Sequence, residues 1–530
     1  MSYTYEFYMQ MEDGVELYTA VLLPEKGAKC PVIITRSPYE KKQSANLTEE
    51  GPYGKILQHC RGTGLSQGVC QAYRNERKDG LELLEWIRKQ DFYNGEIFLY
   101  GGSYLSSVHF AYLGTGQKDI KGAFLAVQDC KRYNILYRNG FYKTGLHGGW
   151  VIGMYKRNEE NVRRDYVPET LRTFPLAGIT EHIFGERVDF IEEEFLHPDP
   201  ADPFWQTPEG GSEYADCCNK CACPVLLSTA FYDIYTGGVF DMWKSLAPER
   251  KKQCFLVVTP FDHNYDPAPR TEDSPLPDFE NGRLREVCPD LHRQFFDFCR
   301  GGEKPDFVTQ GCLTYYRLFD KKWITSPELT NAPLEKCFFL EKDRSLQTAP
   351  PPEDGSITYT YNPYAPAPFE GGVCNNFGGM KIQHEPNSRY DIISFVSAPL
   401  EEDLLCEGEM EVTLEVSSTA PDSCFYVRLD LVREGKALSL RDDIDSLCRV
   451  KKEYTPGEKC LLHYTFAPHA FRLFKEDCLR LDVSSSCVPY FQVHTNRKGL
   501  QALQTGADLC RNTVHTGNSF VKLYYKKPEE

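Results

Sequence analysis

A serine placed between an apolar strand and an apolar helix constrains the fold of this chain more than any other feature. Residues 96–100 (EIFLY) predict a short buried strand, and GGSYLSSVHFAYLG follows directly. The two glycines before Ser103 permit a tight turn, and the residues after it predict a helix. Leu105 stands where a glycine usually closes such a turn, so an ordinary glycine-rich turn remains an alternative on this motif alone.

Strands alternate with helices on both sides of this turn. Such alternation is typical of a parallel sheet covered by helices, so we expect an α/β fold. We assign 1–130 and 221–305 to this core. The predicted strands are 15–23, 31–36, 55–60, 96–100, 224–230 and 254–260, and the predicted helices are 76–90, 237–246 and 290–300.

Two further segments differ in character from this core. Residues 131–220 are aromatic, helix-leaning and broken by prolines, which indicates an inserted helical cap. Residues 306–530 contain many strand-like runs in which apolar and polar residues alternate, and these predict a jelly-roll-like β-sandwich. A chain of 530 residues is too long for one hydrophobic core, so several packed units are expected.

Charge and hydropathy exclude several classes of partner. The formal net charge of −16 argues against nucleic acid, whose binding requires a basic surface. No run of about 18 apolar residues occurs, so no membrane span is expected. The first residues lack the basic and apolar regions of a signal peptide, and we therefore expect a cytoplasmic protein. Nothing in the sequence indicates the oligomeric state.

The 21 cysteines are expected to be free thiols in a reducing compartment. A cluster at 217–223 (CCNKCAC) could suggest a thiolate metal site. A structural zinc usually needs a second, separated pair of ligands, and none follows nearby. A linker before the next strand is the favoured interpretation, and no metal is predicted.

Two side chains downstream lie in positions that suit Ser103. Asp233 follows the strand 224–230 and His263 follows the strand 254–260. Parallel strands in a right-handed crossover open their loops at the same sheet edge, so all three side chains are expected to meet there. A serine hydroxyl needs a base to take its proton and a carboxylate to orient that base. The order Ser, Asp, His is the one found in α/β-hydrolases.

An acyl-transfer site also needs two donors for the developing oxyanion. The main-chain N–H of Tyr104, which follows the serine, is the first candidate. The second donor normally comes from the loop after an early strand, which here contains Ser37-Pro38-Tyr39. The Tyr39 hydroxyl could serve, although on spacing alone packing beside Pro38 is the more frequent role.

Several segments of the chain match one known family, namely 13–24, 36–41, 61–68, 79–106, 231–238, 259–264, 391–432 and 479–491. In these segments the chain resembles the cocaine esterase and X-prolyl dipeptidyl-peptidase-like (CocE/NonD) serine hydrolases. The resemblance implies a triad of Ser103, Asp233 and His263 and an oxyanion hole built from Tyr104 and Tyr39. It implies an α/β-hydrolase core with an inserted helical cap and a C-terminal jelly roll, and no metal or organic cofactor.

Two positions depart from the family pattern. Ser106 replaces a small glycine after the nucleophile, which should strain the packing of helix on strand only mildly. His59 stands where an acidic residue commonly precedes the Arg61-Gly62 pair, so a supporting role for that position is in doubt. Neither departure affects the three triad residues.

The expected reaction is hydrolysis of an ester or amide of a small acyl group through an acyl-enzyme. The alternative substrate is an X-Pro dipeptide or an α-aminoacyl ester or amide, and a noncatalytic carbohydrate-binding protein on a degenerate core is an alternative of another class. Tyr235 and Trp205 could line the substrate pocket or could simply pack. The glutamates at 192–194 are expected to be a solvated helix face, although they could bind a substrate ammonium.

Overall fold

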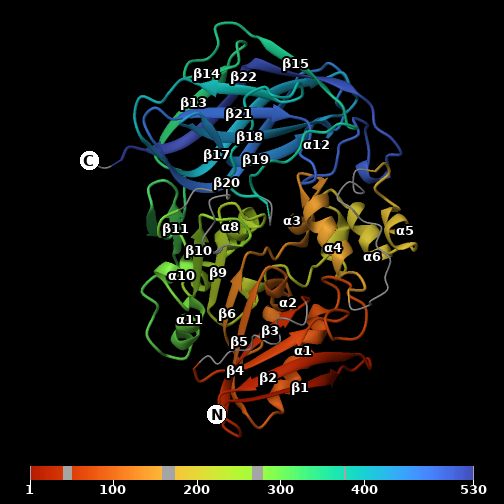
Figure 1. Ribbon diagram of the computed structural model, residues 1–530, viewed down its shortest axis with the longest axis vertical. Coiled ribbons are helices and arrows are strands. Elements are labelled where there is room, and N and C mark those ends of the chain that lie inside the picture. Colours follow the sequence, from red (N-terminus) through yellow and green to blue (C-terminus); the bar gives the residue numbers. More distant parts are fainter. Residues whose placement is uncertain (1, 40–50, 158–172, 265–278, 375–377, 529–530) are drawn as a thin grey trace.

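A computed structural model describes residues 2–39, 51–157, 173–264, 279–374 and 378–528. These residues form two ten-stranded sheets and a small two-stranded one. The segment between β6 and β9 lies beside both large sheets (Figure 1). In the ranges given above, no helix combines the length and the apolar character that crossing a membrane requires.

The first sheet has the strand order β1-β2-β4-β3-β5-β6-β9-β10-β11-β12. The strands from β4 to β11 in this order run parallel, whereas the pairs β1–β2, β2–β4 and β11–β12 are antiparallel. All six predicted strands are present. The strand bounds are β1 Tyr3–Gln10, β2 Glu16–Leu23, β3 Cys30–Ser37, β4 Gly54–His59, β5 Tyr93–Gly102, β6 Ile120–Ala126, β9 Val225–Ala230, β10 Cys254–Thr259, β11 Leu313–Arg317 and β12 Lys322–Ser326.

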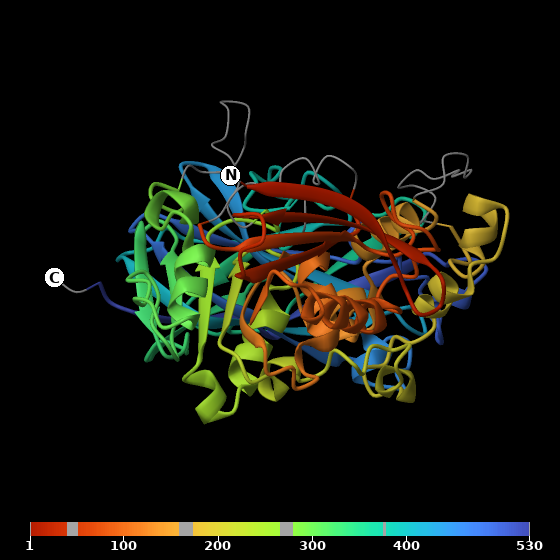
Figure 2. The same cartoon turned by 90° about the horizontal axis from the view of Figure 1, so that it is seen from below.

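Helices cover both faces of this sheet, as the predicted α/β class requires. Because side chains alternate along a strand, Ile97 and Leu99 of β5 join the core under α1 and α2, whereas Phe98 packs with α11 on the other face. Figure 2 shows the α1–α2 pair, in orange, against one face of the N-terminal strands. The helices of this region are α1 Glu76–Arg88, α2 Tyr104–Leu113, α8 Thr236–Ser245, α9 Pro248–Lys251, α10 Leu284–Val287 and α11 Leu291–Cys299.

Short helices predominate between β6 and β9, where an inserted cap is predicted. They lie between the first sheet and the C-terminal strands on one side of the molecule (Figure 1). The elements are α3 Arg132–Leu136, β7 Tyr137–Arg138, β8 Phe141–Tyr142, η2 Thr144–Gly148, α4 Gly149–Met154, α5 Ile179–Phe184, α6 Asp189–Glu192, η4 Glu193–Phe195, η5 Pro203–Gln206 and α7 Cys217–Lys220.

The C-terminal region is rich in strands, as predicted, and its jelly-roll topology stays a prediction. The sheet order is β19-β18-β21-β16-β14-β13-β22-β17-β20, with β15 paired to β22. The elements are β13 Leu334–Leu340, β14 Ser345–Gln347, β15 Ser356–Tyr361, β16 Ile393–Ser397, β17 Leu404–Ser418, β18 Cys424–Arg433, β19 Lys436–Ser446, α12 Leu447–Val450, β20 Cys460–Leu473, β21 Cys478–Ser484, η6 Gln501–Leu503 and β22 Cys510–Lys526.

The first sheet continues beyond the limit expected at residue 305. Strand β11 pairs in parallel with β10, and β12 pairs with β11, so residues 313–326 extend the α/β sheet. The Leu318 N–H then donates to the Ala470 carbonyl of β20 at 3.0 Å and ties the two regions together. The chain therefore changes to successive strands at β11, before it leaves the first sheet.

Candidate active site

Ser103 lies in a strained turn between β5 and α2. Its backbone has φ 57° and ψ −131°, a conformation that costs a non-glycine residue about 1–3 kcal/mol. A Cβ at Gly101 would lie 2.3 Å from the Leu105 carbonyl oxygen, so this position requires glycine. The Ser103 N–H donates to the Ala126 carbonyl of β6 at 2.9 Å, which fixes the turn to the sheet.

Ser106, the departure from the family pattern, is fully buried and hydrogen-bonded. Its hydroxyl donates to the Gly101 carbonyl at 2.9 Å and accepts from the Ala126 N–H at 3.0 Å. A buried hydroxyl is tolerated when its hydrogen-bonding capacity is met. The serine therefore fits between α2 and the two strands without disturbing the turn.

The structure brings Ser103, His263 and Asp233 together at one sheet edge. The Ser103 Oγ lies 2.8 Å from His263 Nε2, and His263 Nδ1 lies 2.7 Å from Asp233 Oδ1. Asp233 is fully buried, and its second oxygen accepts from the Thr229 hydroxyl at 3.0 Å. The three residues follow β5, β10 and β9, the strand ends that the sequence predicts. This geometry suits transfer of the serine proton to the imidazole.

Two candidate donors adjoin Ser103. Tyr104 is the first residue of α2, where main-chain N–H groups have no partner within the helix. Tyr39 follows β3, and its hydroxyl interacts with the side chains of Ser103 and Trp150. Burial raises the pKa of Tyr39, so this hydroxyl keeps its proton and can donate.

A cavity of about 480 Å³ opens at Ser103 and His263. Tyr235 lines it and meets the His263 ring edge to face, with centroids 5.6 Å apart. The lining of the cavity is rich in aromatic residues and, among the residues that the structure describes, contains no carboxylate. The other lining residues are Tyr39, Tyr73, Gly102, Tyr104, Val127, Gln128, Leu146, His147, Trp150, Ile234 and Asn264.

Trp205 does not line this cavity, contrary to one of the two alternatives the sequence leaves open. Its ring packs edge to face against Tyr133, Tyr137 and Phe204, and its indole N–H donates to the Asp199 carbonyl at 3.0 Å. The aromatic cluster within the cap therefore holds this side chain.

Three ring-bearing residues of the cavity lining were missed from the sequence, namely Tyr73, His147 and Trp150. They come from a loop before α1 and from the cap, and their rings lie 5.9–6.2 Å apart. No spacing in the sequence distinguishes them from the many other aromatic residues of the chain.

The expectation of a solvated glutamate face at 192–194 is wrong for two of the three residues, since only the Glu193 side chain is partly exposed, at 40%. Glu192 is 1% and Glu194 0% exposed. The Glu194 carboxylate accepts from Arg132, and one of its oxygens lies 3.1 Å from His147 Nε2. Burial alone would raise the pKa of Glu194, but its interactions with His147 and Arg132 bring it below its ordinary value.

Glu192 is engaged just as fully. It accepts from the Gly178 N–H at 2.6 Å and from the N–H and hydroxyl of Thr180 at 2.9 and 2.5 Å. Both buried carboxylates therefore serve internal contacts of the cap and do not line the cavity at Ser103.

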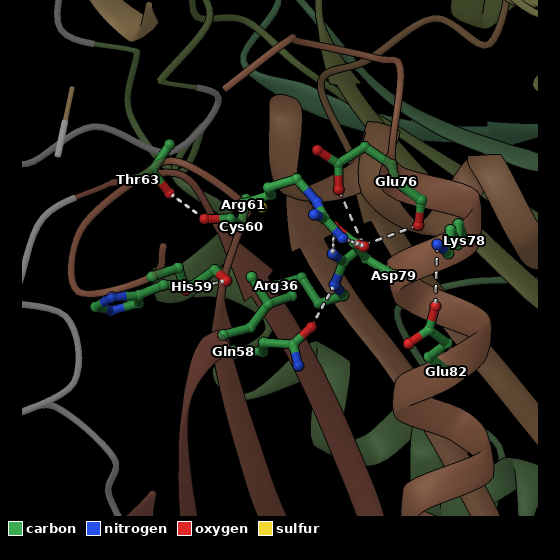
Figure 3. Close-up of polar contacts among 12 residues, drawn as sticks. Arg36, Gln58, His59, Cys60, Arg61, Thr63, Glu76, Lys78, Asp79 and Glu82 are labelled. Carbon is green, nitrogen blue, oxygen red and sulfur yellow. Dashed lines mark hydrogen bonds and ion pairs between the residues drawn. The ribbon is translucent and has the colours of Figure 1, made fainter. Parts of the chain in front are cut away.

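Arg36, Arg61, Glu76 and Asp79 form a buried cluster of charged side chains (Figure 3). Arg36 donates to Glu76 at 2.9 Å, and Arg61 forms two hydrogen bonds with Asp79 at 2.6 and 3.2 Å. The Tyr104 hydroxyl donates to Glu76 Oε1 at 2.7 Å. The cluster thus anchors the residue whose main-chain N–H is the candidate oxyanion donor.

His59 stands outside this cluster. Figure 3 shows its ring pointing away from the charged side chains. The ring is buried, its Nδ1 accepts from the Leu65 N–H at 3.1 Å, and burial lowers its pKa to about 4. A neutral histidine here supports the turn at 61–64 and takes no part in the ion pairs.

The cysteine cluster at 217–223 is buried beside Arg250. The guanidinium donates to Cys221 Sγ at 3.1 Å and to the Cys223 carbonyl at 2.8 Å. Across the ranges that the structure describes, no three His, Cys, Asp or Glu side chains are grouped as metal ligands would be. The contacts fit the predicted link into β9.

Comparison with known proteins agrees with this fold. Residues 13–265 match the model of the X-Pro dipeptidyl-peptidase (S15) family, and residues 308–521 match its C-terminal non-catalytic domain. A cocaine esterase from Rhodococcus sp. (strain MB1 Bresler) is 23% identical, over 96% of this chain and 95% of the relative.

Two solved structures share the fold along almost the whole chain. An α-amino acid ester hydrolase superposes with a TM-score of 0.83 at 18% identity, covering 99% of this chain and 97% of the other. An aminopeptidase from a marine sediment Thaumarchaeota archaeon gives 0.84 at 16% identity, covering 99% and 96%. Because the two family models together span residues 13–265 and 308–521, the chain belongs to the CocE/NonD and X-Pro dipeptidyl-peptidase-like family of serine hydrolases.

Proposed function

We propose that this enzyme hydrolyses esters of small, uncharged acyl groups, with Ser103 as nucleophile, His263 as base and Asp233 as the orienting carboxylate. The observation that carries the proposal is the continuous hydrogen-bonded chain of these three side chains, at 2.8 and 2.7 Å, at the wall of an aromatic cavity. Membership of a serine hydrolase family supports the enzyme over the noncatalytic alternative.

The reaction proceeds through two acyl transfers. His263 Nε2 takes the Ser103 proton as Oγ attacks the ester carbonyl carbon, and the tetrahedral intermediate collapses when the imidazolium protonates the leaving alkoxide. Water then attacks the acyl-enzyme, giving its proton to His263, and the acid leaves as the proton returns to Ser103. Throughout the reaction, the Asp233 carboxylate accepts the hydrogen bond from the Nδ1–H of His263 and stabilises the imidazolium.

The oxyanion is stabilised by the Tyr104 N–H and the Tyr39 hydroxyl. Each donor aimed at a developing oxyanion contributes about 3 kcal/mol of transition-state stabilisation. The raised pKa of Tyr39 supports this role, because a neutral hydroxyl donates where a phenolate would repel the negative charge.

The cavity favours an uncharged acyl group. A substrate ammonium needs a carboxylate partner when it leaves water. The described lining residues offer none, and the nearby Glu194 is already bound to Arg132 and His147. Aromatic rings such as Trp150 and Tyr235 instead provide apolar surface for the acyl chain. The aminoacyl and X-Pro substrates therefore rank second.

Ser103→Ala tests the assignment directly. The variant should lose turnover of p-nitrophenyl acetate by at least about 1,000-fold and should no longer be labelled by a fluorophosphonate probe. Unchanged turnover in a folded variant would refute Ser103 as nucleophile.

A substrate panel tests the choice of acyl group. We expect p-nitrophenyl acetate, butyrate and benzoate to be cleaved with a higher kcat/KM than Gly-Pro p-nitroanilide or aminoacyl amides. A preference for the Gly-Pro compound would make the peptidase the main activity.

The expected cytoplasmic location stays a prediction, to be checked by fractionation of the source cells.

A further inference from the structure

The loop 231–234, between β9 and α8, carries Asp233 and is tied first to the sheet edge. The Phe231 N–H donates to the Thr259 carbonyl at 2.9 Å, and the Tyr232 N–H donates to the Phe261 carbonyl at 3.0 Å. Thr259 ends β10, and Phe261 lies between β10 and His263. These bonds set the spacing between the loops of the acid and the base.

The C-terminal region supplies a second set of contacts to the same loop. The Cys374 N–H donates to the Tyr232 carbonyl at 3.0 Å, and the Cys374 carbonyl accepts from the Ile234 N–H at 3.1 Å, so Asp233 is bracketed on both sides. The Tyr232 hydroxyl donates to the Ser439 carbonyl at 3.0 Å. An irregular buried loop needs such partners for its main-chain polar groups.

Arg441 of β19 completes this set. Its guanidinium donates to the Phe231 carbonyl, two residues before Asp233, and to the carbonyls of Pro468 at 3.1 Å and Ala467 at 3.3 Å. The same group lies 5.8 Å from the centroids of the Phe231 and Tyr232 rings. Arg441 is 1% exposed.

Only an arginine spans these acceptors. Its planar fork presents five donors in fixed directions, whereas the lysine ammonium is a compact group on a flexible stem. Burial lowers the pKa of Arg441 to about 10, so the side chain still carries its charge at neutral pH. The positive charge of Arg441 therefore acts on the loop 231–234 through the Phe231 carbonyl.

We propose that the C-terminal β-rich region positions the catalytic acid, and that Arg441 is its main positioning residue. This inference rests on the proposed function, since it assigns Asp233 as the acid. The matched family model describes the region as non-catalytic, and a positioning role agrees with that, because none of these residues touches the reacting atoms. A displacement of about 1 Å in a catalytic group can cost about 100-fold in rate.

The test compares Arg441→Met with Arg317→Met on p-nitrophenyl acetate. Arg317 is a matched control, because it too is a buried arginine linking the two regions, through Glu407 at 2.8 Å. We expect Arg441→Met to lower kcat about 10- to 100-fold with KM changed less than two-fold. We expect Arg317→Met to keep kcat within two-fold of wild type.

The pH profile separates positioning from general loss of structure. The acid limb of kcat/KM reports the base in the free enzyme. A displaced Asp233 stabilises the imidazolium less, so this limb should move to lower pH in Arg441→Met and return part of the way in Arg441→Lys. A folded Arg441→Met with an unchanged kcat and acid limb would overturn the proposal.

A second variant keeps the proposal testable if Arg441→Met does not fold. Tyr232→Phe removes only the bond to Ser439, and we expect it to move the acid limb in the same direction with kcat lowered about two- to five-fold. An unchanged limb in that variant counts against the proposal. Ser103→Ala distinguishes failure of the proposed function from failure of the positioning role. An active Ser103→Ala variant refutes the proposed function itself, independently of the result for Arg441.

Discussion

The Tyr104 hydroxyl donates to Glu76 Oε1 at 2.7 Å and accepts from the Tyr73 N–H at 3.0 Å. One side chain thus links the first residue of α2 to a carboxylate that is itself held by Arg36 at 2.9 Å. The buried charges therefore fix the position of Tyr104, whose main-chain N–H at the start of α2 is the candidate oxyanion donor. Tyr73, which lines the cavity, is fixed by the same hydroxyl.

Tyr104→Phe should lower both stability and turnover. The change leaves Glu76 and the Tyr73 N–H without this partner, at a cost of about 1–3 kcal/mol in the free energy of unfolding. It also loosens the start of α2, so kcat should fall several-fold with little change in KM. Tyr112→Phe is the control, since it breaks a buried bond of the same helix, to His109 at 2.6 Å. Equal kcat losses in both variants would contradict the anchoring role.

Tyr39→Phe should lower kcat about 100-fold and leave KM nearly unchanged, because the hydroxyl is expected to bind the oxyanion more tightly than the ground-state carbonyl. Steady-state kinetics on p-nitrophenyl acetate measure this. Tyr53→Phe serves as the control, since the Tyr53 hydroxyl donates to Asp297 of α11, on the face of the sheet away from α1 and α2. A Tyr39 variant with wild-type kcat would remove Tyr39 from the oxyanion hole.

Much of this site could be predicted because strand ends are local features. Ser103, Asp233 and His263 each follow an apolar run, and the handedness of crossovers brings such ends to one edge. Burial of charge depends on contacts across the fold, which no window of sequence contains. Glu194 therefore looked solvated, although its partners Arg132 and His147 lie 62 and 47 residues away.

The same limit explains the other differences. Trp205 is near the cap end in sequence, but the cluster that holds it includes residues about 70 positions earlier, such as Tyr133. Strands β11 and β12 follow the last long helix of the α/β region and precede the C-terminal strands without a helix between them. They belong to the first sheet because β11 pairs with β10 and β12 pairs with β11, and a strand pattern does not encode such pairing.

Glu194→Gln should destabilise the cap strongly. Removing the carboxylate charge leaves Arg132 without its buried partner, and breaking a buried pair in this way costs about 3–5 kcal/mol. Urea unfolding measures the effect. Glu193→Gln is the matched control, because its side chain is 40% exposed and pairs with Arg74. We expect that variant to lose less than about 1 kcal/mol. Similar losses at both positions would argue against a buried role for Glu194.

The contribution of His59 to the stability of the protein should fall as the pH drops from 6.5 to 4. Burial lowers the pKa of this imidazole from 6.5 to about 4 in the folded protein. Within that window the unfolded chain binds a proton that the folded chain does not, so acid favours unfolding. The loss from His59 amounts to at most about 3 kcal/mol. Burial lowers the pKa of His109 and His469 as well, so they add to the slope in the same direction.

His59→Gln tests this contribution. The amide can still accept from the Leu65 N–H but does not titrate, so the variant should lose less stability than the wild type between pH 6.5 and 4. Urea unfolding at several pH values measures the difference. His384→Gln is the control, because that side chain is 66% exposed and paired with Glu370. We expect its pH dependence to follow the wild type in this window. If His59→Gln also kept the wild-type slope, the buried imidazole would not be a source of the acid sensitivity.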